Sequence, residues 1–268
     1  MFNANSGATG WAGLASIESW ENLALNHIGH VHSQVNTYYA NSYSDSYVQG
    51  IYCQEIGHGF GLDHSNTGDC MGLGYYSSTT YYTGPHNWND IYNVYRYSHH
   101  SAAPAVQGTN ASDKPTAFAV WAYNPKSLGE LKSLAKDIVM GKVIKVEKGR
   151  DIVHNIKGEP KPVRIPTQTI TFEVTKSFKG VPAGTRVQIF KTGDGNFRIA
   201  DDPAYEVGKE YLLFLKPQGG TGKSLVVSPA GRYQVEGGKL RSVTEEGLGA
   251  RFDGFSVQSF VQRVQSAR

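Results

Sequence analysis

Residues 53–64 read CQEIGHGFGLDH, and the expected fold of the first part of the chain follows from this stretch. If the stretch is helical, positions 54 and 58 lie four residues apart and point from the same face. The side chains of Gln54 and His58 can then share one metal ion. Glu55 is rotated from Gln54 by about 100° around the helix axis. Its carboxylate therefore lies beside the ion, where it can take a proton from a bound water.

Gly61 and His64 complete the pattern. Glycine lets the chain turn out of the helix without a Cβ penalty, so His64 can return to the metal from the far side. The stretch resembles the HExxHxxGxxH zinc signature of the metzincin metallopeptidases, because Glu55, His58, Gly61 and His64 match four of its five fixed positions. Met71 follows at a distance that suits the methionine turn of that family.

The resemblance implies a zinc-dependent endopeptidase. Zinc would be held by Gln54, His58 and His64, and Glu55 would act as general base toward the zinc-bound water. After attack on a polarised peptide carbonyl, Glu55 would return the proton to the leaving amine. The implied cofactor is Zn²⁺, and the implied partner is a protein or peptide substrate.

Gln54 is the departure from the family pattern, which has histidine at that position. An amide oxygen is a neutral ligand and binds zinc more weakly than an imidazole nitrogen. Three interpretations stay open: Gln54 ligates zinc anyway, His58 and His64 hold a weaker site together with water, or the site is inactive. In the first two interpretations the chain is an active enzyme, and in the third it is an inactive pseudopeptidase.

The two cysteines, Cys53 and Cys70, flank the motif. On the metzincin pattern Cys53 lies beside the first ligand position and Cys70 precedes the turn methionine, so the two residues should approach each other under the metal. A disulfide between them would indicate an oxidising, extracellular compartment. A reduced, buried pair is the alternative. The prediction is a secreted protein, although no signal peptide is visible in the sequence.

Charge divides the chain into two parts. Residues 1–112 contain one basic residue, Arg96, against seven acidic residues, whereas the remainder carries 25 Lys and Arg against 16 Asp and Glu. Near the change, Ala, Ser, Gly, Asn and Pro dominate and apolar periodicity disappears. We predict a metzincin-like domain at 1–100, a linker at 101–115 and an accessory domain at 116–268.

In the first domain, residues 10–17 and 30–39 have the pattern of strands. Asp45 is a suitable N-cap for a helix over residues 47–59, and a further short helix is expected over 89–97. The first helix has four apolar residues at helical spacing: Val48, Ile51, Tyr52 and Ile56. Residues 1–44 supply less sheet than metzincin domains normally have before this helix, so we expect a truncated start.

The second domain has the pattern of strands with turns rich in Gly, Pro and Lys. Strands are expected over 138–147, 169–176, 187–191, 211–215 and 225–228, followed by a helix from about Ser256 with Val257, Phe260, Val261 and Val264 on one face. This succession predicts an all-β, barrel-like domain and weakly resembles netrin-like modules of the OB-barrel type. The predicted fold class of the whole chain is α+β.

Two further groups of residues are weighed. His30 and His32 would face the same side of a strand, with His27 nearby, so a metal site is one interpretation, and one of these residues could replace the ligand missing at position 54. Because no carboxylate or cysteine lies at ligand spacing, we favour ordinary strand residues. Tyr75 and Tyr76 follow the methionine turn, where some metzincins place a tyrosine that reaches the metal. Their spacing differs, so a structural or cleft-wall role is favoured over contact with substrate or oxyanion.

Composition restricts the remaining functions. No apolar run approaches the length of a membrane span, and the basic surplus lacks the aromatic residues of nucleic-acid platforms. The basic second domain could favour an anionic surface. Besides the endopeptidase, the hypotheses are an inactive pseudopeptidase that binds peptides or surfaces, and a zinc hydrolase of non-peptide amides.

Overall fold

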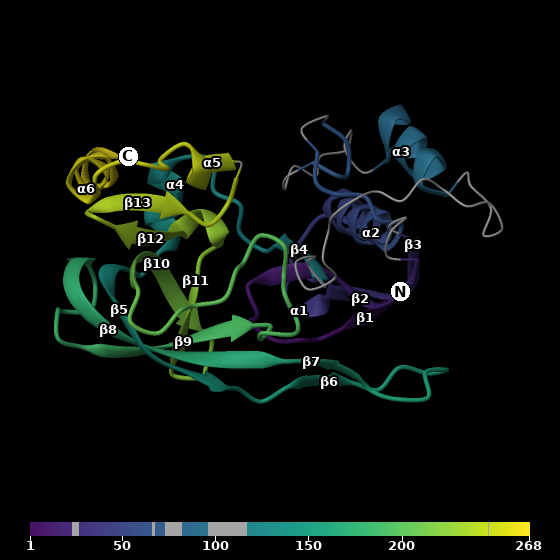
Figure 1. The fold of residues 1–268 in the computed structure, drawn as a ribbon, viewed down its shortest axis with the longest axis horizontal. Coiled ribbons are helices and arrows are strands. Elements are labelled where there is room, and N and C mark those ends of the chain that lie inside the picture. The colour runs from purple at the N-terminus through teal and green to yellow at the C-terminus, as the bar shows by residue number, and fades with distance from the viewer. Residues whose placement is uncertain (23–26, 66–67, 73–81, 96–116, 246) are drawn as a thin grey trace. The chain divides into compact units, whose positions relative to one another are not determined.

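The structure is a computed structural model (Figure 1), and it describes residues 1–22, 27–65, 68–72, 82–95, 117–245 and 247–268. The chain forms two compact units, and it has the mixed α+β character predicted. The first unit comprises residues 1–7, 11–121 and 156–163, and the second comprises residues 8–10, 122–155 and 164–268. The predicted linker at 101–115 lies outside the described residues.

The first unit contains a four-stranded sheet of order β1-β3-β2-β4. β2 (Trp11–Asn22) pairs antiparallel with β3 (His27–Asn36) and with β4 (Ala117–Trp121), and β1 (Phe2–Ala4) pairs parallel with β3. The strand expected to continue to residue 39 ends at Asn36. The Asn36 side chain accepts the Tyr38 N–H and caps the short helix α1 (Thr37–Ala40), so the chain cannot continue as a strand.

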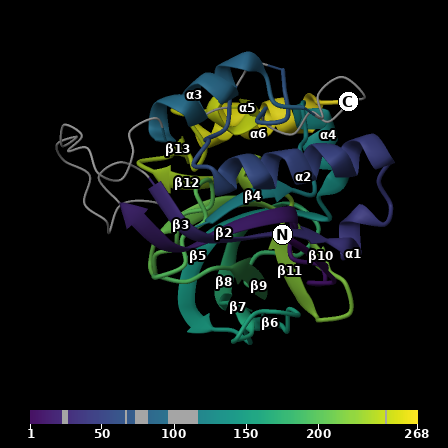
Figure 2. The same cartoon turned by 90° about the vertical axis from the view of Figure 1, so that its right-hand side faces the viewer.

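The helix that carries the motif is α2 (Asp45–Gly59), and it packs across one face of this sheet (Figure 2). The predicted cap was wrong by one residue: Ser44 is the N-cap, because its hydroxyl accepts the Tyr47 N–H, and Asp45 is the first helical residue. Gly61 adopts a φ of 84° just after the helix, as glycine readily does.

The four apolar residues at helical spacing in α2 do not form a buried face. Of these four residues only Ile51 is buried, and Ile56 is 45% exposed. The helix instead turns Gln54, Glu55 and His58 inward. Gly57 permits this orientation, because a Cβ at that position would collide with the sulfur of Met71. Polar side chains therefore lie where a core helix normally places apolar ones.

A third helix of this unit, α3 (Pro85–Tyr95), begins before the residues 89–97 that the sequence predicted. Proline suits the first turn of a helix, since its missing N–H has no partner there in any case, and this explains the earlier start. Residues 96 and 97 lie outside the described part of the chain.

In the second unit, seven strands form one sheet of order β11-β9-β8-β5-β10-β12-β13. Pairing of β10 with β11 closes five of them, β11, β9, β8, β5 and β10, into a ring. The elements of this unit are β5 (Asp137–Lys148), β6 (Ile152–His154), β7 (Val163–Ile165), β8 (Thr167–Lys179), β9 (Arg186–Thr192), β10 (Glu210–Gln218), β11 (Lys223–Val226), β12 (Arg232–Glu236), β13 (Lys239–Ser242), α4 (Leu128–Leu134), α5 (Gly247–Ala250) and α6 (Val257–Ser266).

The predicted C-terminal helix is confirmed as α6. Ser256 caps it, and Phe260 and Val264 are buried in the apolar cluster that also holds Leu131 of α4. A separate cluster contains alternate residues of the ring strands, among them Phe172 of β8 and Leu213 of β10. The second unit therefore has two apolar layers, one among the ring strands and one under the helices.

Two buried cations in the second unit, Lys191 and Arg232, are paired with Asp202. Arg232 is 1% exposed, and its guanidinium donates to Asp202 Oδ1 at 2.7 Å and to the Pro203 carbonyl at 2.6 Å. Lys191 donates to the Asp202 carbonyl at 2.8 Å and forms an ion pair with the Asp202 carboxylate. One carboxylate thus compensates two buried cations.

Candidate functional site

The inward face of α2 holds three polar side chains that are almost fully buried. Gln54 is 1% exposed, and Glu55 and His58 are 0% exposed. Each side chain is positioned by one of its polar atoms. Gln54 Nε2 donates to the Gly72 carbonyl at 3.4 Å, Glu55 Oε1 accepts the Val120 N–H at 3.3 Å, and His58 Nδ1 lies 2.7 Å from the Leu62 carbonyl oxygen.

The second polar atom of each of these side chains has no hydrogen-bond partner among the described residues. These atoms are Gln54 Oε1, Glu55 Oε2 and His58 Nε2. An unsatisfied buried polar atom costs about 1–3 kcal/mol, so three of them on one helix face call for an explanation. A ligand or ion bound to this face would satisfy them.

The hydrogen bond of His58 determines which tautomer is present. A carbonyl oxygen can only accept, so Nδ1 carries the proton and Nε2 keeps its lone pair. Burial lowers the pKa of His58 to about 3, with a smaller contribution from His64, while the bond to Leu62 opposes the shift. A neutral imidazole whose other nitrogen is held by a carbonyl is the form in which histidine binds metals.

His64 lies next to His58. The two ring centroids are 4.8 Å apart, with 74° between the ring planes. The chain returns in this way because Gly61 follows the helix with positive φ and the Leu62 N–H donates to the Gly57 carbonyl. The structure therefore places His64 beside His58, and Gln54 is buried one helical turn before His58 on α2.

These residues suit zinc by their donor chemistry. Zinc accepts imidazole nitrogen and side-chain oxygen, and sites with three protein ligands leave a position for water. Gln54 Oε1 and His58 Nε2 are buried acceptors without a donor among the described residues. Atoms that ligate a metal are expected to lack a donor in the same way when the ion is absent. Gln54, His58 and His64 thus provide one oxygen donor and two imidazoles.

Glu55 points toward the sheet. A Cβ at Gly13 of β2 would collide with Glu55 Oε1, so glycine is needed there to admit the carboxylate. Burial raises the pKa of Glu55 well above its ordinary value of 4.5, and the hydrogen bond from Val120 opposes the shift. A raised pKa is typical of carboxyl groups that transfer protons.

The turn that holds Met71 is fastened beneath α2. Met71 is fully buried against Gly57, and its N–H donates to Asp69 Oδ1 at 3.0 Å. The predicted disulfide is confirmed: Cys53 and Cys70 are bonded, with Cα atoms 5.9 Å apart. The covalent link and the Asp69 carboxylate fix the turn directly under the candidate ligands.

β4 covers the same site. The Phe118 ring stacks on His58 with centroids 4.6 Å apart and 12° between the planes. Two residues later, the Val120 N–H donates to Glu55. Sequence patterns do not predict this contact, because residues 117–121 are far from α2 along the chain.

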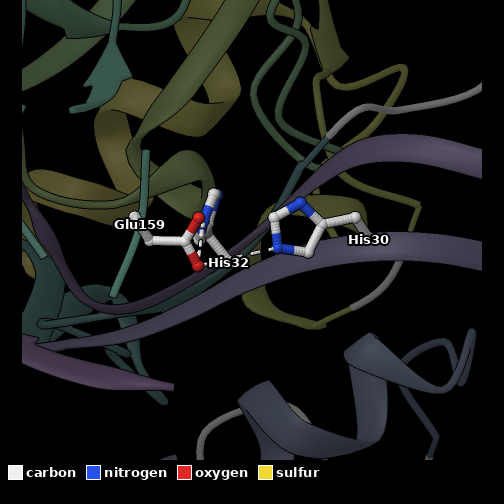
Figure 3. Close-up of side chains that lie close together, drawn as sticks. All are labelled: His30, His32 and Glu159. Carbon is white, nitrogen blue, oxygen red and sulfur yellow. Dashed lines mark ion pairs between the residues drawn. The ribbon is translucent and has the colours of Figure 1, made fainter. Parts of the chain in front are cut away.

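A second candidate metal site lies on β3 (Figure 3). His30, His32 and Glu159 form the only group of three His, Cys, Asp or Glu residues, within the described part of the chain, whose ligand atoms all lie within 4.8 Å of one another. The sequence interpretation of His30 and His32 as ordinary strand residues missed Glu159, which comes from the turn between β6 and β7. No local pattern connects that glutamate to β3.

One other residue named from the sequence, His27, is not brought to either site. His27 stacks on Tyr95, and its Nε2 lies 2.7 Å from the Val94 carbonyl oxygen. Tyr75 and Tyr76 lie outside the described residues.

Comparison with known proteins does not assign the chain to a family. No model of a known protein family matches the chain, and no curated protein matches its sequence. None of the helices among the described residues is both long and apolar enough to cross a membrane.

Proposed function

We propose that the chain is a zinc-dependent endopeptidase of the metzincin type with its active site on α2. One observation carries the proposal: three atoms that the motif would use, Gln54 Oε1, Glu55 Oε2 and His58 Nε2, are buried and lack partners among the described residues. An ion or ligand bound at this face would satisfy them, and the motif predicts zinc there.

Each residue has a distinct role in this proposal. Gln54, His58 and His64 would hold the ion, and zinc, when bound, would supply a Lewis acid for the carbonyl and lower the pKa of a water. Glu55 keeps Oε1 on the Val120 N–H and uses Oε2 to take the proton from the attacking water. The same oxygen then returns the proton to the leaving amine.

The setting of the enzyme is part of the same proposal. Disulfides persist in oxidising compartments, so the Cys53–Cys70 bond supports secretion. The five-stranded ring of the second unit supports the likeness to OB-type, netrin-like modules. The basic surplus of that unit suits contact with an anionic surface.

A peptide-binding pseudopeptidase is the second candidate. Gln54 in place of histidine and the Phe118 ring on His58 favour it, because a weak ligand and a covered ligand both reduce zinc occupancy. In that case the inward face of α2 would hold a peptide segment without cutting it.

The test is cleavage of an unstructured protein by the full chain in added zinc. We expect Glu55→Gln to lower kcat by about 10²- to 10⁴-fold, the contribution typical of general acid–base catalysis. The variant keeps the size of the side chain and an oxygen for the Val120 N–H. Glu173→Gln, on the exposed surface of β8, is the control and should leave kcat unchanged.

Failure of the wild-type chain to cleave, with folding verified by circular dichroism, would favour the pseudopeptidase. Gln54→His then separates the candidates further. Activity that arises only in this variant identifies the natural chain as a binder, whereas activity already present in the wild type shows that the amide ligand is tolerated.

A further inference from the structure

The histidines of β3 lie on the face of the strand that points away from α2. Val31 and Ser33 contact α2, since Ser33 Oγ donates to the Glu55 carbonyl at 2.8 Å and Val31 lies against Gly59. Side chains alternate across a strand, so His30 and His32 share the opposite face. Their ring centroids are 4.5 Å apart.

Glu159 reaches the two histidines from the turn that joins β6 and β7. Residues 156–163 belong to the same compact unit as β3. The turn is fixed by the Glu159 N–H, which donates to the Ile156 carbonyl at 3.1 Å, and by Gly158, whose φ is 96°. Figure 3 shows the carboxylate directed toward both rings.

The distances between these groups suit a shared ion better than direct hydrogen bonds. Glu159 Oε1 lies 3.6 Å from His32 Nε2 and 3.9 Å from His30 Nε2, beyond the ordinary range for a hydrogen bond. Two ligands of a tetrahedral zinc ion, each at about 2.0–2.1 Å from it, lie roughly 3.3 Å apart. A small inward movement of the three side chains would therefore complete a site.

His32 is the least exposed of the three residues and lies between two carboxylates, Glu18 and Glu159. Its side chain is 13% exposed, and both of its ring nitrogens are buried without a hydrogen-bond partner among the described residues. Nδ1 lies 3.3 Å from Glu18 Oε1, which is close enough for a carboxylate to orient the ring. A histidine that presents Nε2 to a metal and Nδ1 to a carboxylate is a common arrangement in zinc proteins.

We propose that His30, His32 and Glu159 form a second metal site, which binds a divalent transition-metal ion of the zinc type. Two imidazoles and one carboxylate are the ligands these ions prefer, whereas calcium and magnesium take oxygen ligands. The ion fastens the β6–β7 turn to β3, and the partly exposed side of the site is completed by water. This site does not depend on the proposed peptidase activity.

The test combines zinc binding with hydrogen exchange on the full chain. After removal of metal with a chelator, zinc is titrated by equilibrium dialysis into the wild type, Glu159→Gln and His32→Asn. We expect each substitution to weaken one zinc site at least tenfold, because losing even an outer-shell partner of a ligand costs about 10- to 100-fold. Glu147→Gln, an exposed carboxylate paired with Lys145, is the matched control and should bind as the wild type does.

Hydrogen exchange shows where the ion binds. Zinc should slow exchange of the backbone amides of residues 156–163 in the wild type and in His58→Leu, but not in Glu159→Gln. Zinc affinities that are unaffected by Glu159→Gln and His32→Asn would overturn the proposal, as would exchange in 156–163 that zinc does not change. Loss of protection in His58→Leu as well would also overturn it, because the ion would then sit on α2.

Discussion

Two groups of buried side chains, one in each unit, differ in whether their main polar groups are paired within the protein. In the second unit, Asp202 compensates Lys191 and Arg232, so the buried cations have partners within the protein. On α2, Gln54 and His58 each keep one buried acceptor without a partner among the described residues. The first arrangement serves stability, because each charge is already satisfied. In the second arrangement, an ion or ligand that binds to the free acceptors would stabilise the protein further. Such acceptors are typical of a binding site and uncommon in a structural core.

The largest effect is expected where the satisfied arrangement is broken. Asp202→Asn removes the carboxylate that faces two buried cations, and breaking a buried ion pair from one side costs about 3–5 kcal/mol. Urea denaturation should show that loss in the free energy of unfolding. Glu147→Gln, which breaks only an exposed pair, should change it by less than about 0.5 kcal/mol; equal effects would show that the network is not stabilising.

The disulfide gives the next effect, in the first unit. Replacing both Cys53 and Cys70 by alanine opens a loop whose ends are 17 residues apart in sequence, and closing such a loop contributes about 3 kcal/mol. Hydrogen exchange should locate the loss in α2 and residues 68–72. The control is the wild type in reductant, which should lose similar protection. Faster exchange throughout the second unit would contradict this assignment.

Zinc binding should stabilise the first unit by slightly less than the disulfide does. A ligand at 100 times its dissociation constant adds about 2.7 kcal/mol to the stability of the state that binds it. Thermal unfolding with and without zinc should show a gain in the wild type. His58→Leu should lose the part of this zinc-dependent stabilisation that comes from binding at α2, and Glu159→Gln should lose the part that comes from binding at β3. If zinc stabilised His58→Leu as much as the wild type, zinc binding at α2 would be contradicted.

The smallest effect is expected where an unsatisfied atom is removed. Gln54→Met keeps the approximate volume of the side chain and deletes the partnerless Oε1, together with the 3.4 Å bond to Gly72. We expect the free energy of unfolding to stay within about 1 kcal/mol of the wild type, since replacing a buried polar group by an apolar one of similar shape is nearly neutral. Zinc affinity should fall. A loss as large as that of Asp202→Asn would place Gln54 among the structural groups.

The proximity of His58 and His64 could be predicted from the sequence because the two residues are close along the chain. They are joined by a turn at Gly61, so their proximity follows from local geometry. Ligation of zinc by Gln54, His58 and His64 stays a prediction. The apolar spacing of α2, by contrast, does not indicate which residues are buried: Gly57 packs on Met71, and its neighbour Ile56 is 45% exposed.

The β3 site could not be predicted in this way. His30 and His32 carry no signal of a third ligand, and Glu159 reaches them only because the β6–β7 turn belongs to the unit that contains β3. The pairing of β2 with β4 is equally distant in sequence. Contacts of this kind depend on tertiary structure, and single-sequence patterns do not encode them.

On the proposed peptidase function, the position of β4 has a practical consequence for inhibitor design. The strand places an aromatic ring on His58 and, two residues later, a backbone N–H on Glu55. Its sequence, AFAVW, is thus a template for a peptide that would occupy this face of α2. The spacing between the ring and the N–H is the dimension that such a compound has to reproduce.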